Sequence, residues 1–253
     1  MDKIYSLFSH FRTGSPTSKD KRERDEAINL MESAKYSAAI PLFLDLIESD
    51  SEDCTIHYMV GQCYKFNGQL PEAIESLKKA QGLMKDSATP KMEASIYLAL
   101  GIAYQNSKEF EKAVTSLETG ISECPKTWKL HNSLGLTFKI MNEPRKALVN
   151  YEIAQQLIVE AASSEAEAYE TRILIKDGSK TLLVDMEKFR ITLKSSPNYC
   201  TILNNIGGVY IYIGDLESAE NALKESIEFI PDGFDYPPPQ EGLDLIKSMK
   251  TVE

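Results

Sequence analysis

The sequence predicts an all-α protein made of stacked helical hairpins, and three observations support this. Within residues 95–125, apolar side chains recur at helical spacing before and after a break at Asn106, and Pro125 ends the second run. Small residues such as Gly101 and Ala113 stand where two helices would cross, with large apolar residues around them. The same arrangement recurs along most of the chain, so that neighbouring hairpins can bury the apolar faces that one hairpin leaves open.

The recurring unit is defined by a glycine, an aromatic residue three positions later and an alanine twelve positions after the glycine. From Gly101 to Gly135 is 34 residues, which is the period of the pattern. The four clear units contain Gly61, Tyr64 and Ala73; Gly101, Tyr104 and Ala113; Gly135, Phe138 and Ala147; and Gly207, Tyr210 and Ala219. Ala27 and Ala39 have the same twelve-residue separation and indicate a further unit near the start.

These units resemble tetratricopeptide repeats, whose period and alternation of small and large residues they reproduce. The resemblance covers residues 20–231, most of the chain. It implies a right-handed α-solenoid of about six helix-turn-helix hairpins, of which five are recognisable and one is degenerate. It implies a surface for protein interaction and says almost nothing about which partner is bound.

The predicted domain organisation has three parts. Residues 1–19 form an N-terminal amphipathic helix and a linker, residues 20–231 the repeat solenoid, and residues 232–253 a proline-rich segment and a C-terminal capping helix. The N-terminal helix has two interpretations: a flap that covers the first repeat, which we favour, or a docking or membrane-surface helix. A cap is favoured over a separate ligand-like tail at the other end, because a solenoid needs a polar outer face where it stops.

The unit at about 162–198 is degenerate, because Ile173 replaces the glycine and Asp185 the alanine. The elements expected here are a helix at Ser164–Lys176, a turn at Asp177-Gly178 and a helix at Lys180–Lys194. After the last repeat, Phe234–Pro239 is expected to be extended because of its three prolines, and a short helix is expected at Glu241–Lys250.

Composition argues against several classes of protein. The formal net charge of −10 makes a general nucleic-acid binder improbable, because binding to a phosphate backbone requires a basic face. No apolar run approaches the roughly 18 residues of a membrane helix. The 4 cysteines lack CxxC spacing, which favours reduced thiols and a cytoplasmic location.

We find no constellation of catalytic or metal-ligating residues, and we therefore predict no enzyme activity, no cofactor and no metal. His57 and His131 each stand four residues before the glycine of their repeat, and this equivalence indicates packing. Gly207-Gly208 lacks the lysine and spacing of a phosphate-binding loop.

The resemblance implies that the first helix of each hairpin lines a concave groove. The side chains expected to point into it lie three residues before the repeat glycine, one after it and four after it, with one cation a turn earlier. The predicted peptide-binding groove consists of Arg24, Ile28, Met31, Tyr58, Gln62, Lys65, Leu98, Ile102, Gln105, Lys129, Asn132, Leu136, Lys139 and Asn204. This set contains cations, amides and apolar groups but no carboxylate, so it suits a peptide or helix with acidic and apolar side chains.

The sequence therefore predicts a non-catalytic scaffold or adaptor that binds another protein in this groove. Two alternatives stay open: a structural subunit that self-associates through its terminal helices into a homo-oligomer, and a helper or chaperone domain of a secretion or signalling system. The clamp that some repeats of this kind form around a C-terminal carboxylate is disfavoured. Asn132 and Asn205 are available for it, but no consecutive trio of repeats supplies the full set.

Overall fold

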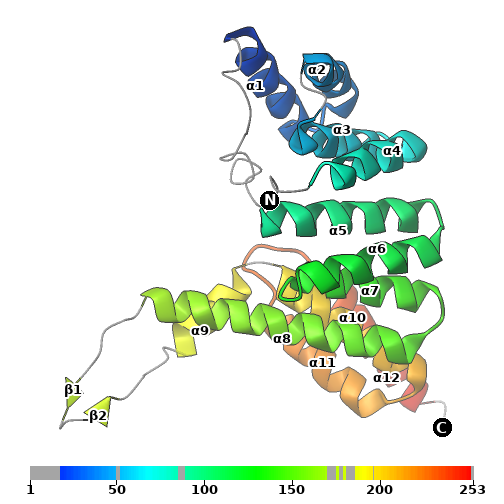
Figure 1. Cartoon of the computed structure of the whole chain (residues 1–253). Helices are drawn as coiled ribbons and strands as arrows, with labels where there is room; N and C mark the ends of the chain where they lie inside the picture. The colour runs from blue at the N-terminus through cyan, green and yellow to red at the C-terminus, as the bar shows by residue number, and fades with distance from the viewer. Residues whose placement is uncertain are drawn as a thin grey trace. The chain divides into compact units, whose positions relative to one another are not determined.

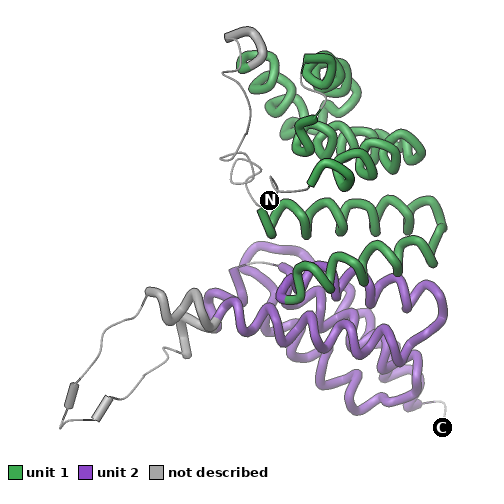
Figure 2. Tube along the Cα trace, viewed as in Figure 1, with its two compact units in different colours: residues 1–125 green, residues 126–253 purple. Residues whose placement is uncertain are grey.

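The chain folds into two compact units, residues 1–125 and residues 126–253 (Figure 2). This computed structural model describes residues 18–49, 52–84, 89–169, 175–176, 179–180, 186–195 and 197–251. The amphipathic helix predicted near the N-terminus lies outside the described residues. Of the predicted segment 1–19, only residues 18 and 19 are described, and they begin the first repeat helix.

Unit 1 contains three helical hairpins, and the first helix of each is antiparallel to the second (Figure 1). The hairpins are α1 (Ser18–Glu32) with α2 (Tyr36–Ser49), α3 (Cys54–Phe66) with α4 (Leu70–Gly82), and α5 (Pro90–Asn106) with α6 (Phe110–Glu123). Two of the helix starts carry side-chain caps: Asp53 accepts a hydrogen bond from the Thr55 amide at 2.8 Å, and Thr89 accepts one from the Met92 amide at 3.3 Å.

The turns of the hairpins share one backbone hydrogen bond, whose acceptor lies near the end of the first helix. In the second hairpin the Gln69 amide donates to the Tyr64 carbonyl at 2.9 Å, which closes a six-residue turn. The same bond joins Lys35 to Leu30, Glu109 to Tyr104, Glu143 to Phe138 and Asp215 to Tyr210. The residue before each donor has a positive φ: Ala34, Gly68, Lys108, Asn142 and Gly214.

The predicted close crossing of the two helices is confirmed. A Cβ atom on Gly101 would lie 2.6 Å from Cγ of Leu117, which is too close for any real side chain. On Gly61 it would lie 2.8 Å from Leu77. In both hairpins the glycine therefore lets the second helix place a leucine directly against the backbone of the first.

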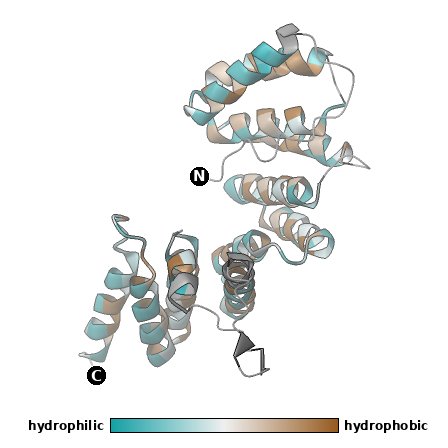
Figure 3. Cartoon of the chain, turned by 90° about the vertical axis from the view of Figure 1, so that its left-hand side faces the viewer, coloured by the Kyte–Doolittle hydropathy of each residue, from teal (hydrophilic) through white to brown (hydrophobic). Residues whose placement is uncertain are grey.

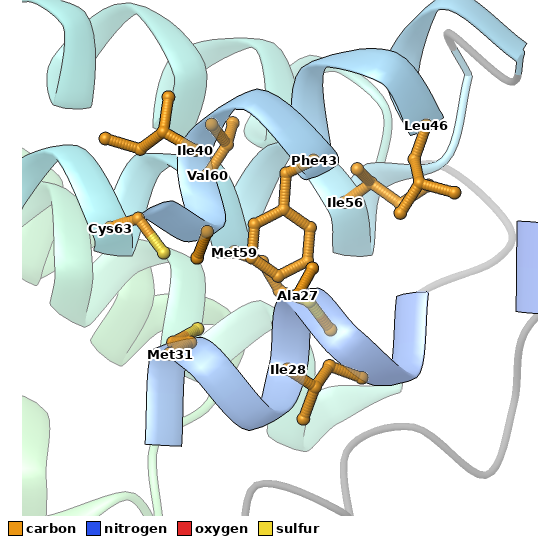
Figure 4. Packing of buried hydrophobic residues seen from close by; sticks show 11 residues of the cluster. Ala27, Ile28, Met31, Ile40, Phe43, Leu46, Ile56, Met59, Val60 and Cys63 are labelled. Atoms are coloured by element: carbon orange, nitrogen blue, oxygen red, sulfur yellow. The ribbon is translucent and has the colours of Figure 1, made fainter. Parts of the chain in front are cut away.

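The apolar residues of unit 1 fill the space between its helices. Ala27 of α1, Phe43 of α2 and Ile56 of α3 are almost completely buried in one cluster (Figure 4). Figure 3 shows hydrophobic and hydrophilic residues side by side on the same helices, as amphipathic helices require. None of the helices in the described parts of the chain is both long and apolar enough to cross a membrane.

Unit 2 has two hairpins of the same kind and a longer connection between them. Its elements are α7 (Trp128–Ile140), α8 (Pro144–Tyr169), β1 (Ile175–Lys176), β2 (Ser179–Lys180), α9 (Met186–Lys194), α10 (Asn198–Ile213), α11 (Leu216–Glu228) and α12 (Pro238–Lys250). The small residues again allow a close crossing, since a Cβ on Gly135 would lie 2.9 Å from the Tyr151 ring and one on Gly207 2.7 Å from Leu223.

Both helices expected in the degenerate unit have the wrong bounds, and the turn expected at Asp177-Gly178 lies outside the described residues. α8 continues to Tyr169, so no separate helix begins at Ser164. β1 and β2 then form an antiparallel ladder in which Ile175 pairs with Lys180, and the next helix starts at Met186. The glycine and alanine of the other units are missing from this stretch, and its described parts form no further helical hairpin of the regular type.

α10 packs directly against α8. The hairpin α10–α11 therefore follows α8 in the stack, although the segment that contains α9 lies between them in the sequence. The Tyr210 hydroxyl donates to Glu152 at 3.2 Å, and Gln155 Nε2 donates to the Tyr199 hydroxyl at 3.4 Å. α9 packs beside the extended end of α8, where Leu193 is buried with Tyr199.

α12 covers the last hairpin, as a cap would. Ile246 is buried against Leu223, and Lys250 Nζ donates to Glu220 at 2.8 Å. The helix begins earlier than expected, at Pro238. Proline is tolerated in the first turn because the amide that it lacks has no helical partner there, so the predicted extended segment ends at Pro237.

Candidate peptide-binding surfaces

The predicted groove residues belong to the first helices of the hairpins in both units, and each unit is described by itself. We call the face formed by α1, α3 and α5 the first-helix face of unit 1, and the face formed by α7 and α10 the first-helix face of unit 2. No described group of three or more histidine, cysteine or acidic residues is arranged to hold a metal ion. The four cysteines are free and buried, and burial raises the pKa of Cys63 to about 12, which makes this thiol unreactive.

Two of the predicted residues on α1 lie in the core. Ile28 and Met31 are buried in the cluster with Phe43 and Met59, so they present little surface to a partner (Figure 4). The cation of Arg24 is also engaged, since its Nη2 lies 3.8 Å from Oδ2 of Asp53, which caps α3. The first repeat therefore contributes less to the face than its sequence positions indicated.

The α3 part of the face is a polar cluster with an unusual cation. Gln62 Nε2 donates to the Tyr58 hydroxyl at 2.7 Å, and the Tyr58 hydroxyl also forms a hydrogen bond with Ser95 of α5. The Gln62 Oε1 atom is buried and has no hydrogen-bond partner. Burial lowers the pKa of Lys65 to about 8, and its Nζ lies 4.5 Å from the centre of the Phe66 ring.

The rest of the face in unit 1 comes from α5, where Leu98, Ile102 and Gln105 are half-buried. These residues lie on the helix that meets α3 through the Tyr58–Ser95 hydrogen bond. The face thus combines a desolvated ammonium group, an amide oxygen without a donor and aliphatic side chains. An unsatisfied buried acceptor costs about 1–3 kcal/mol, and a donor from a bound peptide would recover that energy.

The first-helix face of unit 2 contains a pocket of about 170 Å³. Its walls come from the end of α7, the turn before α8 and the middle of α10. The residues that line it are Lys139, Asn142, Pro144, Gly208, Val209 and Tyr212. The Tyr212 hydroxyl donates to Asn142 Oδ1 and closes one side. Lys139 forms no ion pair with any residue that the structure describes, so a cation stands beside a largely apolar cavity.

Other predicted residues extend this face along α7. Leu136 is exposed next to the pocket, and the Oδ1 atom of Asn132 is buried without a hydrogen-bond partner. Lys129 is half-buried, with its Nζ 5.6 Å from the centre of the Trp128 ring.

The chain itself covers part of the α10 surface. The Tyr236 hydroxyl forms hydrogen bonds with Asn204 and Thr201. Ile211 packs against Leu243 of α12. Only the stretch of α10 around Gly208 stays open on this face.

Sequence reasoning missed the position five residues after the repeat glycine. Phe66, Ile140 and Tyr212 occupy it, with 58%, 49% and 64% of their surface exposed. The signal was available, because large apolar residues recur at one exposed position of three repeats. These residues lie next to the groove residues Lys65 and Lys139 along the chain and enlarge the apolar area beside both cations.

Comparison with known proteins agrees with this architecture. The family model described as tetratricopeptide repeat matches residues 55–85, 94–127 and 201–232, which correspond to the hairpins α3–α4, α5–α6 and α10–α11. The search of curated proteins found no match to the sequence. The family model thus identifies three tetratricopeptide repeats within this chain.

Solved structures of the same fold cover most of the chain. A crystal structure of MamA is 20% identical, covers 80% of this chain and 93% of its own, and superposes with a TM-score of 0.57. The structure titled MamA 41-end from Desulfovibrio magneticus RS-1 is 13% identical, with coverage of 85% and 97% and a TM-score of 0.60. YrrB, titled a TPR protein with an unusual peptide-binding site, is 14% identical, with coverage of 88% and 90% and a TM-score of 0.56. Identities this low show a shared fold only.

Proposed function

We propose that this protein is a non-catalytic scaffold or adaptor whose first-helix faces bind a partner peptide or helix with acidic and apolar side chains. Tetratricopeptide-repeat proteins act generally as protein-interaction scaffolds, which supports the class of function. The chemistry of the partner rests on the two cations, Lys65 and Lys139, that stand on these faces without an ion-pair partner among the described residues. A cytoplasmic location stays a prediction from the cysteine pattern.

The pocket beside Lys139 is the observation that carries the proposal. Its volume of about 170 Å³ lies below the roughly 300–1,000 Å³ of small-molecule sites. At about 30 Å³ per water molecule, it has room for five or six waters, which is the size of one apolar side chain. A peptide that anchors such a side chain in the pocket would bring a neighbouring carboxylate to the Lys139 ammonium group.

Selection of a random peptide phage library on the whole protein tests this proposal. We expect enriched peptides to carry an aliphatic or aromatic residue within two positions of an aspartate or glutamate. Gly208→Leu should abolish their binding because the new side chain fills the pocket, and Lys139→Glu should weaken it by charge repulsion. Lys126→Glu is the matched control, since Lys126 is exposed and lies outside the pocket.

Circular dichroism on each variant separates loss of binding from loss of fold. At Gly208, a Cβ atom would meet nothing closer than Lys139 Nζ at 3.6 Å, so the leucine should be tolerated. If enriched peptides lack acidic residues, or bind Gly208→Leu and wild type equally, this function is wrong for the first-helix face of unit 2.

A second function, self-association into an assembly, is supported by one observation. Leu245 and Met249 are exposed on α12, one helical turn apart, at the C-terminal end of unit 2. Light scattering on the wild type and on Leu245→Glu/Met249→Glu tests it. An oligomer that dissociates in the variant would support assembly through this helix, and a wild-type monomer at high concentration would exclude it.

A further inference from the structure

A second groove lies on unit 1, between the second helices of its first two hairpins. It has a volume of about 550 Å³, and it is formed by α2 on one side, α4 on the other and α3 at the bottom. The residues that line it are Leu44, Ile47, His57, Val60, Tyr64, Glu72, Glu75, Ser76, Lys78 and Lys79. None of them belongs to the predicted peptide-binding groove, so this surface is separate from the first-helix face.

Leu44 breaks the pattern of the repeats at this groove. The position five residues after the alanine of the second helix carries a charged residue in the other recognisable repeats: Lys78, Glu118, Glu152 and Lys224. In the first repeat the same position is Leu44, which has 40% of its surface exposed. Ile47, one turn further along α2, lines the same wall. A solvent-facing position that is charged elsewhere has therefore become apolar only where it borders this groove.

The bottom of the groove, on α3, is mostly buried, and the opposite wall, on α4, carries charged side chains. Val60 is almost completely buried and His57 is largely buried beneath the groove. Glu72 and Glu75 stand beside Tyr64, where burial raises the pKa of the phenol and their negative charge raises it further.

The charges on α4 are arranged in order along the helix. Neither Glu72 nor Glu75 forms an ion pair with a residue in the described ranges. Lys78 and Lys79 follow one turn after Glu75, so one end of the groove is acidic and the other basic.

We propose that this groove binds an amphipathic helix of a partner protein, with apolar side chains against Leu44, Ile47 and Val60 and a basic side chain between Glu72 and Glu75. From Glu72 to Lys79 the wall spans about 10 Å at 1.5 Å per residue, which is about two helical turns. Helices that dock in such grooves use apolar anchors three or four residues apart, and two turns accommodate two or three of them. The unpaired carboxylates select a basic ligand, in contrast to the acidic ligand proposed for the first-helix face.

Fluorescence anisotropy with designed helical peptides tests the proposal on the full chain. The probe is a labelled 16-residue amphipathic helix with leucines along one face and arginines flanking them, beside twins in which the arginines are glutamates or glutamines. We expect the arginine peptide to bind at least about tenfold more tightly than the glutamate peptide. Leu44→Lys, which restores the charge found in the other repeats, should weaken binding by about tenfold or more, because one apolar contact is lost.

Charge reversal supplies the complementary variant. Glu72→Lys/Glu75→Lys should remove the preference for arginine, and binding of the glutamate peptide should increase. Lys126→Glu in unit 2 is the matched control and should leave the affinity unchanged, since Lys126 is exposed and lines neither of the two proposed sites. Both Leu44 and the two glutamates are exposed, so the variants should keep the wild-type helicity.

Several results would overturn the proposal. They are no measurable binding of the arginine peptide, equal binding of the three peptides, or equal affinity of wild type and Leu44→Lys. Loss of binding in Gly208→Leu, which fills the pocket beside Lys139, would assign the peptide to the first-helix face of unit 2 instead. Tighter binding after deletion of residues 1–17 would show that the chain's own N-terminal segment occupies the groove, and the partner helix would then not be its resident ligand.

Discussion

Two junctions between consecutive hairpins differ: α4 to α5 in unit 1, and α8 to α10 in unit 2. In unit 1, α3 and α4 cross closely at Gly61, and α5 follows as the next layer. In unit 2, α8 is twice as long as α4, and α10 packs on it after an inserted segment that contains α9. The sequence differs at the same place, because Ile173 and Asp185 stand where the other units have a glycine and an alanine. The described part of this stretch continues α8 and does not repeat the regular hairpin.

The largest loss of stability should come from placing a side chain where two helices cross closely. Gly101→Val places a side chain where a Cβ already lies 2.6 Å from Leu117, and we expect a loss of about 3 kcal/mol or more in the free energy of unfolding. Urea denaturation followed by circular dichroism measures it. The control is Gly82→Val, at a helical glycine with nothing within 4 Å, which should change stability by less than about 1 kcal/mol. Equal effects would show that the crossing is not what the glycine provides.

The next effect tests whether α9 is part of the fold of unit 2. Leu193→Ala should cost about 2–3 kcal/mol, because the side chain is buried with Tyr199 and Ala162. Ile191→Ala, on the exposed side of the same helix, should cost less than about 0.5 kcal/mol. If both substitutions are neutral by urea denaturation, α9 does not stabilise the stack and the comparison between the junctions fails.

Lys65 in unit 1 should contribute to the pH dependence of stability near pH 8–9. Its pKa is lowered to about 8 in the folded state by burial, from an ordinary value of 10.5, so above pH 8 the unfolded chain binds more protons at this site. Stability should therefore rise as pH increases from about 8 towards 10.5, by on the order of 1 kcal/mol after screening by solvent.

The contribution of Lys65 is obtained by difference, because groups with raised pKa values act in the opposite direction. Cys63, raised to about 12, does so from about pH 8 upwards, and tyrosines such as Tyr199, also raised to about 12, do so at higher pH. Wild type and Lys65→Met are compared by urea denaturation at pH 7.0 and 9.0. A gain in stability with pH that is smaller in the variant supports the desolvated ammonium group, and identical pH dependence would contradict it.

The smallest change in stability should come from substitutions at the positive-φ position of the turns. Lys108 and Asn142 adopt positive φ angles of 60° and 62° at the turn position that is glycine in two other hairpins. Lys108→Gly should stabilise unit 1 by up to about 1 kcal/mol, and Gly214→Ala should destabilise unit 2 by about 1 kcal/mol. Thermal unfolding measures both, and a change of the same sign in the two variants would contradict a shared turn geometry.

Much of the fold could be predicted from local patterns of residue size. The spacing of Gly101 and Ala113 indicated a crossing, and the structure confirms it at the expected pair of helices. The degenerate segment could not be predicted in the same way. Its helical periodicity continues α8 as well as it would start a new helix, and only the packing of α10 on α8 distinguishes the two.

The sequence predicted which helices form the candidate site, but it did not predict which of their side chains are accessible to a partner. Lys65 and Lys139 follow the repeat glycines at a fixed distance, and the structure leaves both without an ion-pair partner among the described residues. Met31 occupies the equivalent position of the first repeat but is buried in the first cluster. Asn204 is bound by Tyr236, which lies 32 residues further along the chain. The repeat spacing predicts the direction in which each side chain points. It does not predict whether another part of the chain covers that side chain.

The sequence by itself determined the repeat period, the hairpins, their close crossings and the acidic chain with cations set at regular positions. These features depend on residues within one 34-residue unit, where size and spacing act locally. The tertiary structure decided that α8 runs on, that α12 and Tyr236 cover part of α10, and that two hollows form, one beside Lys139 and one beside Leu44. Each of these depends on contacts between segments far apart in the chain, whose free energies no local pattern contains.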